Sequence, residues 1–93
     1  MATKKSMPLR PNPDVVAQRM GDETVLIHLH TNRIYELNRT GTRFWELLAA
    51  GNDPATIRAT LLNEFAIDPA TLDGEIARIQ TDLLAAGLAR AAG

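Results

Sequence analysis

The two histidines of this chain are separated by a single residue, in the stretch His28-Leu29-His30. Alternate side chains of a β-strand point to the same side, so His28 and His30 are a candidate pair of metal ligands. A third ligand would have to come from elsewhere, with Glu36 and Asp14 as candidates. Two histidines specify a site only weakly, and the alternative is a pair of half-exposed polar residues on the solvent side of a sheet. We favour this alternative and predict neither a metal site nor a cofactor.

The other reactive residue types give little support for catalysis. The chain has no cysteine, and its serine, Ser6, lies in a proline-rich segment near the amino terminus. Nucleophilic catalysis would need such a side chain beside a base. Asp73, Glu75 and Asp82 fall in a predicted helix, where charged side chains usually form a solvated face, and acid–base work would need them buried. We therefore predict that the protein is not an enzyme.

The charge distribution bears on nucleic-acid binding. Residues 1–45 hold seven Lys or Arg against four Asp or Glu, whereas residues 46–93 hold three against seven. A DNA-recognition helix presents basic and amide side chains to phosphates and base edges. The last predicted helix instead carries Arg78 among three carboxylates. A nucleic-acid-binding protein is kept as the alternative from a different functional class, but we predict no nucleic-acid partner.

Length and composition favour one small domain. The 93 residues, 45% of them hydrophobic, are enough for a modest core. No apolar run approaches the roughly 20 residues that cross a bilayer, and Lys4 and Lys5 precede no apolar block of a secretory signal. We expect a cytoplasmic protein with no membrane partner. Its three prolines make residues 1–13 a flexible segment in this interpretation, and residues 14–90 form the domain.

The hydrophobic pattern changes period along the chain. Residues 14–20, 23–30 and 33–38 alternate as strands do, and very short turns separate them, so we predict an antiparallel meander. After Leu37 the apolar residues recur at helical spacing, and either Asn38 or Thr40 can cap the first helix. Asp53-Pro54 and Asp68-Pro69 are two further helix starts, each with a capping aspartate and a first-turn proline. We expect three helices: the first ends at about Gly51, the second begins at Asp53-Pro54 and includes Phe65, and the third covers residues 69–86. The order β-β-β-α-α-α predicts an α+β fold similar to winged helix-turn-helix domains.

The third predicted strand, residues 33–38, would have one edge without a neighbour. Such an edge offers a row of N–H and C=O groups to any extended peptide, and Arg33 and Glu36 protect it only in part. The last helix has an apolar seam made of Leu72, Ile76, Ile79 and Leu83. Beside the seam runs a second stripe, made of Asp73, Ala77, Gln80 and Leu84. This stripe suits the wall of a groove, and the alternative is that Ala77 and Leu84 complete the core.

The stretch from His30 to Phe65, together with that from Ile67 to Leu88, resembles the PqqD-like family of precursor-peptide recognition elements. The similarity covers about residues 14–90 and consists of a tyrosine-bearing strand, Leu-Asn-x-Thr-Gly, an aromatic helix ending in glycine, an apolar helix and a last helix ending in Gly-Leu. The matching positions are Tyr35, Leu37, Asn38, Thr40, Gly41, Trp45, Leu48, Gly51, Ile57, Leu61, Phe65, Leu83, Gly87 and Leu88.

The resemblance implies a non-catalytic adaptor that binds the leader of a ribosomally made precursor peptide. In the family the leader adds as a strand beside the third strand, lies against the last helix, and is delivered to a modifying enzyme such as a leader peptidase or a radical S-adenosylmethionine enzyme. The short turn before Arg33 favours a lasso-peptide type of pathway, with pyrroloquinoline quinone biosynthesis as the alternative. The predicted peptide-binding residues are Arg33, Ile34, Tyr35, Glu36, Leu37, Asp73, Ile76, Ala77, Gln80 and Leu84.

Overall fold

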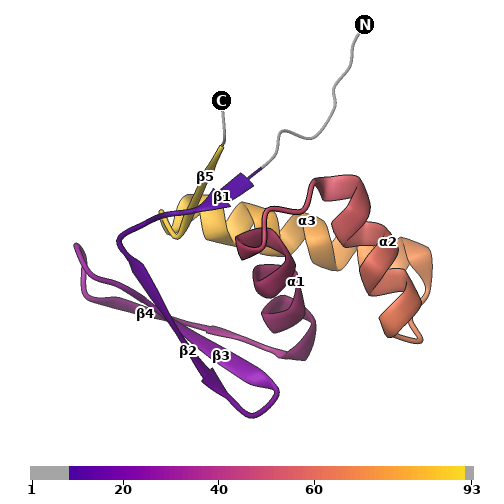
Figure 1. Ribbon diagram of the computed structural model, residues 1–93, viewed down its shortest axis with the longest axis horizontal. Helices are drawn as coiled ribbons and strands as arrows, with labels where there is room; N and C mark the ends of the chain where they lie inside the picture. The colour runs from indigo at the N-terminus through magenta and orange to yellow at the C-terminus, as the bar shows by residue number, and fades with distance from the viewer. Residues whose placement is uncertain (1–8, 92–93) are drawn as a thin grey trace, which may run out of the picture.

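The computed structural model describes residues 9–91, which form five strands and three helices (Figure 1). The elements are β1 (Leu9–Pro11), β2 (Val15–Met20), β3 (Glu23–His28), β4 (Arg33–Leu37), α1 (Arg39–Ala49), α2 (Pro54–Glu64), α3 (Pro69–Ala85) and β5 (Ala89–Ala91). The α+β class is confirmed, because β2, β3 and β4 make a three-stranded antiparallel sheet and the three helices follow it. None of these helices is long and apolar enough to span a bilayer.

The meander closes through two tight turns. Gly21 has φ +65° in the turn between β2 and β3, and Asn32 has φ +61° in the turn between β3 and β4. Glycine and asparagine tolerate this left-handed backbone better than other residues do. The second turn begins earlier than expected, because Asn32 N–H donates to the carbonyl of His28 at 2.8 Å. Strand β3 therefore ends at His28, and His30 lies in the turn.

The alternation on β3 is confirmed, but our assignment of His28 to the solvent side was wrong. Leu26 and His28 are buried, whereas Val25 and Ile27 on the other face are only partly so. Gly87, just after α3, lies beside the His28 ring: a Cβ added there would make an ordinary contact, 3.6 Å from the imidazole Nε2. The inner face of the sheet therefore accepts one histidine where α3 ends.

Each helix begins at a predicted capping residue, and for α1 this is Asn38, one of its two candidates. The side-chain oxygen of Asn38 accepts the Gly41 amide at 2.9 Å at the start of α1. Asp53 and Asp68 cap α2 and α3 in the same way, each followed by proline. A Cβ at Gly41 would lie 3.3 Å from the side chains of Leu37 and Asn38, which is closer than most such contacts. The strand–helix corner is therefore closely packed around this glycine.

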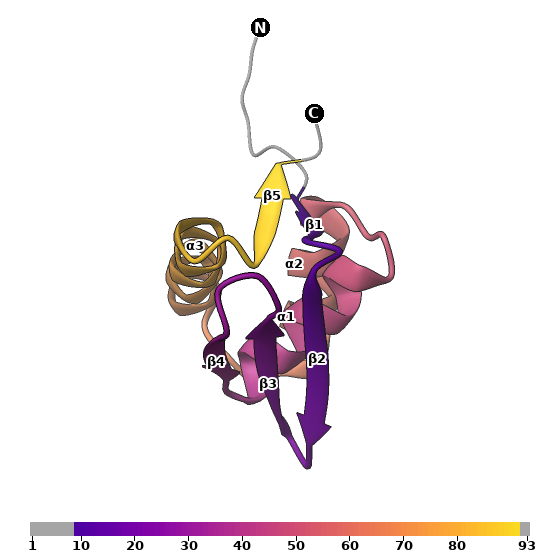
Figure 2. The same cartoon turned by 90° about the vertical axis from the view of Figure 1, so that its left-hand side faces the viewer.

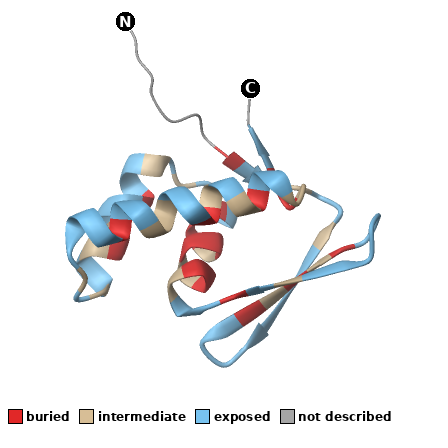
Figure 3. Cartoon of the chain, turned by 180° about the vertical axis from the view of Figure 1, so that it is seen from behind, coloured by how far each residue is buried: buried red, intermediate tan, exposed pale blue. Residues whose placement is uncertain are grey.

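The core is built around α1, which contacts β1, β3, β4, α2 and α3. Figure 3 shows buried residues along the inward sides of α1 and α3. The largest fully buried side chains are Phe44, Leu26, Ile57, Leu61, Leu72, Leu83 and Leu88. Tyr35 packs against this core from β4, and Leu37, which is 5% exposed, belongs to it. Strand β4 is therefore fixed to the helices along one face.

The first strand corrects our expectation for the amino-terminal segment. Leu9–Pro11 pairs antiparallel with Ala89–Ala91, with Leu9 opposite Ala91, and Leu9 is 8% exposed. Asn12 adds two bonds to the end of α3, through its N–H to the Leu88 carbonyl at 3.0 Å and its side chain to the Gly87 carbonyl at 2.9 Å. Residues 9–11, which we expected to be flexible, form a strand. Residues 1–8 lie outside the described part of the chain.

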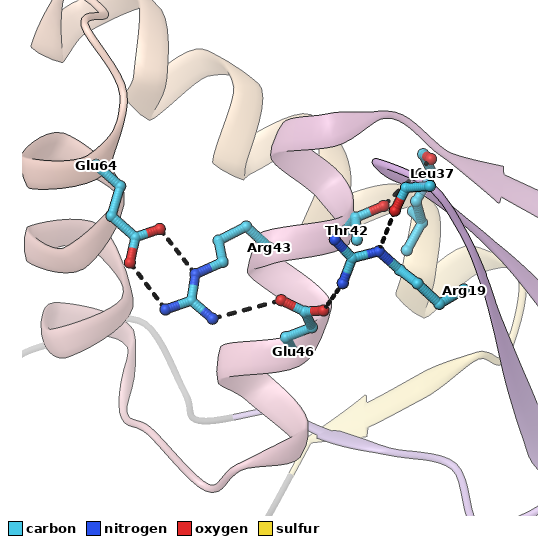
Figure 4. Close-up of polar contacts among 7 residues, drawn as sticks. Arg19, Leu37, Thr42, Arg43, Glu46 and Glu64 are labelled. Atoms are coloured by element: carbon cyan, nitrogen blue, oxygen red, sulfur yellow. Dashed lines mark hydrogen bonds and ion pairs between the residues drawn. The ribbon is translucent and has the colours of Figure 1, made fainter.

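A chain of ion pairs links β2, α1 and α2 (Figure 4). Arg43 on α1 binds the Glu64 carboxylate of α2 through both Nε and a terminal nitrogen, at 2.8 Å each. The Glu46 carboxylate on α1 forms an ion pair with the Arg19 guanidinium of β2. The hydrogen bonds with Glu64 raise the pKa of Arg43 above its usual value, and those from Arg43 lower the pKa of Glu64. These pairs tie β2, α1 and α2 together.

Candidate functional site

Strand β4 forms an edge of the sheet. The strand order is β2-β3-β4, and no strand within residues 9–91 pairs with the outer side of β4. Its residues Ile34 and Glu36 are exposed, with Ile34 at 67%. Figure 2 shows β4 on the same side of the molecule as α3, with β2 on the opposite side. The unpaired edge that the sequence predicted is therefore present and faces the flank of α3.

The hydrogen-bond parity of the sheet identifies which backbone groups are free. Leu29 N–H donates to the Asp14 carbonyl at 2.9 Å, so the odd-numbered residues of β3 direct their amides toward β2. In an antiparallel ladder the direction alternates from residue to residue. The even-numbered residues therefore face β4, where their partners are Leu37, Tyr35 and Arg33. The N–H and C=O groups of Ile34 and Glu36 are left pointing outward.

A pocket of about 140 Å³ lies between this strand and α3. It is lined by Tyr35, Glu36 and Leu37 of β4, by Asn38 and Gly41 at the start of α1, and by Arg78, Ile79 and Asp82 of α3. The pocket lies beside the free edge of β4, so a strand added there would lie next to it. Alternate side chains of such a strand would point into it.

The polar groups of the pocket have a net negative charge. Arg78 lies 3.6 Å from Glu75 and 3.9 Å from Asp82, so one guanidinium serves two carboxylates. The pKa of Tyr35 is raised above its usual value, first by burial and then by the hydrogen bond with Asp82 and the negative charge of that group. Tyr35 thus keeps its proton at neutral pH and offers a hydroxyl to the pocket.

The predicted residues of β4 are brought together at this edge, but those predicted on α3 are not. Asp73 points toward α2, where it pairs with Arg58 at 2.6 Å. Ile76 and Gln80 line a separate pocket of about 250 Å³ between α2 and α3. Helical spacing puts Ala77 and Leu84 on this same flank.

Ala77 and Leu84 do not complete the core either, since both are exposed, Leu84 at 46%. The flank of α3 that faces β4 carries Arg78 and Asp82 instead, which our prediction omitted. A sequence signal for them exists in the spacing of Arg78 and Asp82, four residues apart, with Glu75 three residues before Arg78. We had interpreted these charges as a solvated face.

The two histidines do not form a ligand pair. The Nδ1 atom of His28 accepts the His30 N–H at 3.2 Å, and the centroids of the two rings are 6.4 Å apart. His28 is 7% exposed, whereas the His30 ring lies in solvent, 3.9 Å from the Asp14 carboxylate. Residues 9–91 contain no group of three His, Asp or Glu side chains that could hold a metal ion.

Comparison with solved structures places this geometry beside two complexes. The first, "TbiB1 in Complex with the TbiA(beta) Leader Peptide", has a TM-score of 0.81 and 28% identity, over 87% of this chain and 94% of the other. The second, "Lasso peptide synthetase B1 complexed with the leader peptide", has a TM-score of 0.79 over 89% of this chain and 98% of the other. Its identity of 23% supports a common fold. Both structures are of proteins that bind a leader peptide.

Comparison with protein sequences gives a family. No curated protein sequence matches the chain. The family model described as coenzyme PQQ synthesis protein D (PqqD) matches residues 23–89. This range runs from the start of β3 into β5 and includes the free edge and all three helices. The chain belongs to the PqqD family.

Proposed function

We propose that the protein is a leader-peptide-binding adaptor, which captures the leader of a ribosomally made precursor by adding it as a strand beside β4. This proposal rests on the row of outward N–H and C=O groups at Ile34 and Glu36, next to the pocket against α3. The structural similarity to two leader-peptide complexes supports the same reading. No catalytic step is assigned to the protein.

The rigidity of β4 explains how a short edge can bind. Leu37 is buried beside α1, and the Thr42 hydroxyl donates to the Leu37 carbonyl at 3.4 Å. A strand held in place in advance loses little conformational entropy on binding, so more of the contact energy is available for affinity. Backbone hydrogen bonds bind almost any extended sequence, and the pockets on either side select among side chains.

Two pathways are compatible with this role. The solved neighbours favour lasso-peptide biosynthesis, in which the leader would be passed to a leader peptidase. The family description favours delivery to a radical S-adenosylmethionine enzyme in pyrroloquinoline quinone biosynthesis. Either would place the protein in the cytoplasm, where ribosomal precursors are made. Pull-down with each precursor and its enzyme distinguishes the two pathways.

The test of the binding edge is Ile34→Pro. Proline removes the outward N–H of Ile34 and leaves the ladder between β3 and β4 intact, because proline is tolerated on the free side of an edge strand. We expect affinity for a leader peptide that the unmodified protein binds to fall at least about tenfold, measured by calorimetry.

The matched control is Ala17→Pro. Ala17 is an exposed residue of β2, the other edge strand, and the same parity directs its amide away from β3. We expect this variant to bind the leader as the unmodified protein does. Circular dichroism establishes that both variants fold. Equal affinity of a folded Ile34→Pro variant and the unmodified protein would show that the edge is not the binding site.

A further inference from the structure

The outer face of the sheet, turned away from the helices, has an ordered arrangement of side chains. Val16 lies opposite Ile27, and Ile27 lies opposite Ile34, so one apolar row crosses all three strands and ends at the free edge. The next row consists of Gln18, Val25 and Glu36. Val16 is 44% exposed and Ile34 is 67% exposed, so nothing within the described domain covers the end of the apolar row.

The charges on this face are all of one sign. Glu23 and Glu36 are its charged residues within the three strands, and Arg19 points to the other face, where it pairs with Glu46. Glu36 is at the edge strand, has Val25 across from it on β3, and makes no ion pair with any other described residue. Because Val25 is apolar, Glu36 has no charged partner opposite it on β3. The position beside Glu36 on the outer side of β4 is open to a residue of an added strand.

A strand added beside β4 would extend both rows. Residues directly opposite each other across an antiparallel or parallel pair lie on the same face, and alternate residues of the new strand share that face. The residue beside Ile34 would therefore continue the apolar row, and a residue two positions away would face Glu36. The residue between them would point into the pocket with Tyr35 and Asp82.

We propose that the outer face of β4 selects the leader by a two-residue pattern, in which an aliphatic side chain meets Ile34 and a Lys or Arg two positions away meets Glu36. This inference rests on the proposed function and specifies its substrate class. Glu36 then acts as a charge-selecting residue. An edge carboxylate can also serve only to prevent aggregation through the edge. In that role Glu36 would have no effect on which peptide sequences bind.

The chain offers a well-matched control for Glu36. Glu23 lies on the same outer face and carries the same charge, but it is on β3, one strand inward from the edge. Glu36→Lys and Glu23→Lys change the net charge of the protein equally. A difference between them therefore reports the position of the carboxylate relative to the bound strand, and not the overall field.

The probe is a displayed library of random peptides about a dozen residues long, selected separately on the unmodified protein, on Glu36→Lys and on Glu23→Lys. Binders are retained for comparison only when Ile34→Pro releases them, which restricts the set to edge-bound peptides. We expect Lys or Arg two positions from an aliphatic residue in the set from the unmodified protein and from Glu23→Lys. Glu36→Lys should replace the basic residue by Asp or Glu.

Synthetic peptides then quantify the effect. Exchanging the selected Lys for Glu should weaken binding to the unmodified protein about threefold and strengthen binding to Glu36→Lys by a similar factor. The same amino acids selected on all three proteins, or no preference at this position, would overturn charge selection while leaving edge binding intact. If neither the library nor a set of candidate leader peptides yields a peptide that Ile34→Pro releases, the proposed function itself fails.

Discussion

Tyr35 connects the core of the domain to its candidate binding pocket. Its ring packs against the buried cluster, while its hydroxyl lies with Asp82 and Arg78 in the space between β4 and α3. Burial is the main cause of its raised pKa, and the Asp82 hydrogen bond and charge come second. Because this is the single tyrosine of the chain, its ionisation reports on the pocket directly.

We predict that the tyrosinate absorbance of the folded protein titrates above the usual value of about 10. Asp82→Asn should lower this pKa without returning it to the usual value, because burial remains. The folded pKa is the higher one, so the free energy of unfolding should decrease as the pH rises above about 10. A midpoint that Asp82→Asn leaves unchanged would place the carboxylate too far from the ring to matter.

The burial of His28 could not be predicted from the hydrophobic pattern. Alternation along β3 separates its residues correctly into two sets, but Val25 and Ile27 look at least as suited to a core as Thr24 and His28. The inner face is decided by packing against α1 and, at His28, by the residues that follow α3, which are both distant in sequence. Side-chain polarity therefore gave the wrong face for His28.

At the level of elements, the pairing of β1 with β5 is the main structure that the sequence did not predict. Its two strands are 3 residues each and nearly the whole chain separates them. Short strands with distant partners have no local signal, and the three surrounding prolines resemble a flexible segment. The helix starts at Asp53 and Asp68, in contrast, were predicted correctly, and the start at Asn38 was one of two candidates, because a cap is formed by residues adjacent in sequence.

The strand assignment of residues 9–11 predicts a specific pattern of stability. Leu9→Ala should lower the free energy of unfolding by about 2 kcal/mol, since Leu9 is buried among core residues. Arg10→Ala, one residue along and exposed, should change it by less than about 0.5 kcal/mol. Urea denaturation measures both. If the two variants had equal stability, the segment would not be packed in solution.

The flank of α3 that faces the sheet is a further limit on sequence-based prediction. Helical periodicity identifies the seam containing Leu72, Ile79 and Leu83 and leaves two flanks beside it. Which flank lies against β4 depends on the side from which α3 crosses the sheet, and the third helix reaches that position only after two other helices. The charged flank with Arg78 and Asp82 lies there, and the stripe that begins with Asp73 lies against α2.

For the whole molecule, three of the carboxylates that join the helices or cap them have a lowered pKa. Glu64 binds Arg43 across α1 and α2, Asp73 binds Arg58 across α2 and α3, and Asp53 caps α2. Hydrogen bonds from these partners lower the pKa of Glu64 and Asp73. The bonds that Thr56 makes to Asp53 lower its pKa as well. All three groups thus favour the folded state when ionised.

We predict that the melting temperature decreases as the pH falls below about 4.5, where these carboxylates begin to take up protons in the unfolded chain. Folded pKa values below the unfolded ones mean that the stabilisation is present at neutral pH and is lost on acidification. Arg43→Gln should flatten this decrease, because Glu64 then loses its partner. A decrease equally steep in Arg43→Gln would assign the acid sensitivity to other groups.

The pairing of β1 with β5 also determines where the domain can be fused to another protein. Leu9 and Ala91 lie side by side, so whatever is joined before the one or after the other departs from a common point. That point belongs to the small second sheet, and β4 belongs to the other. A genetic fusion at either end, or a turn that circularises the chain, would therefore leave β4 unobstructed.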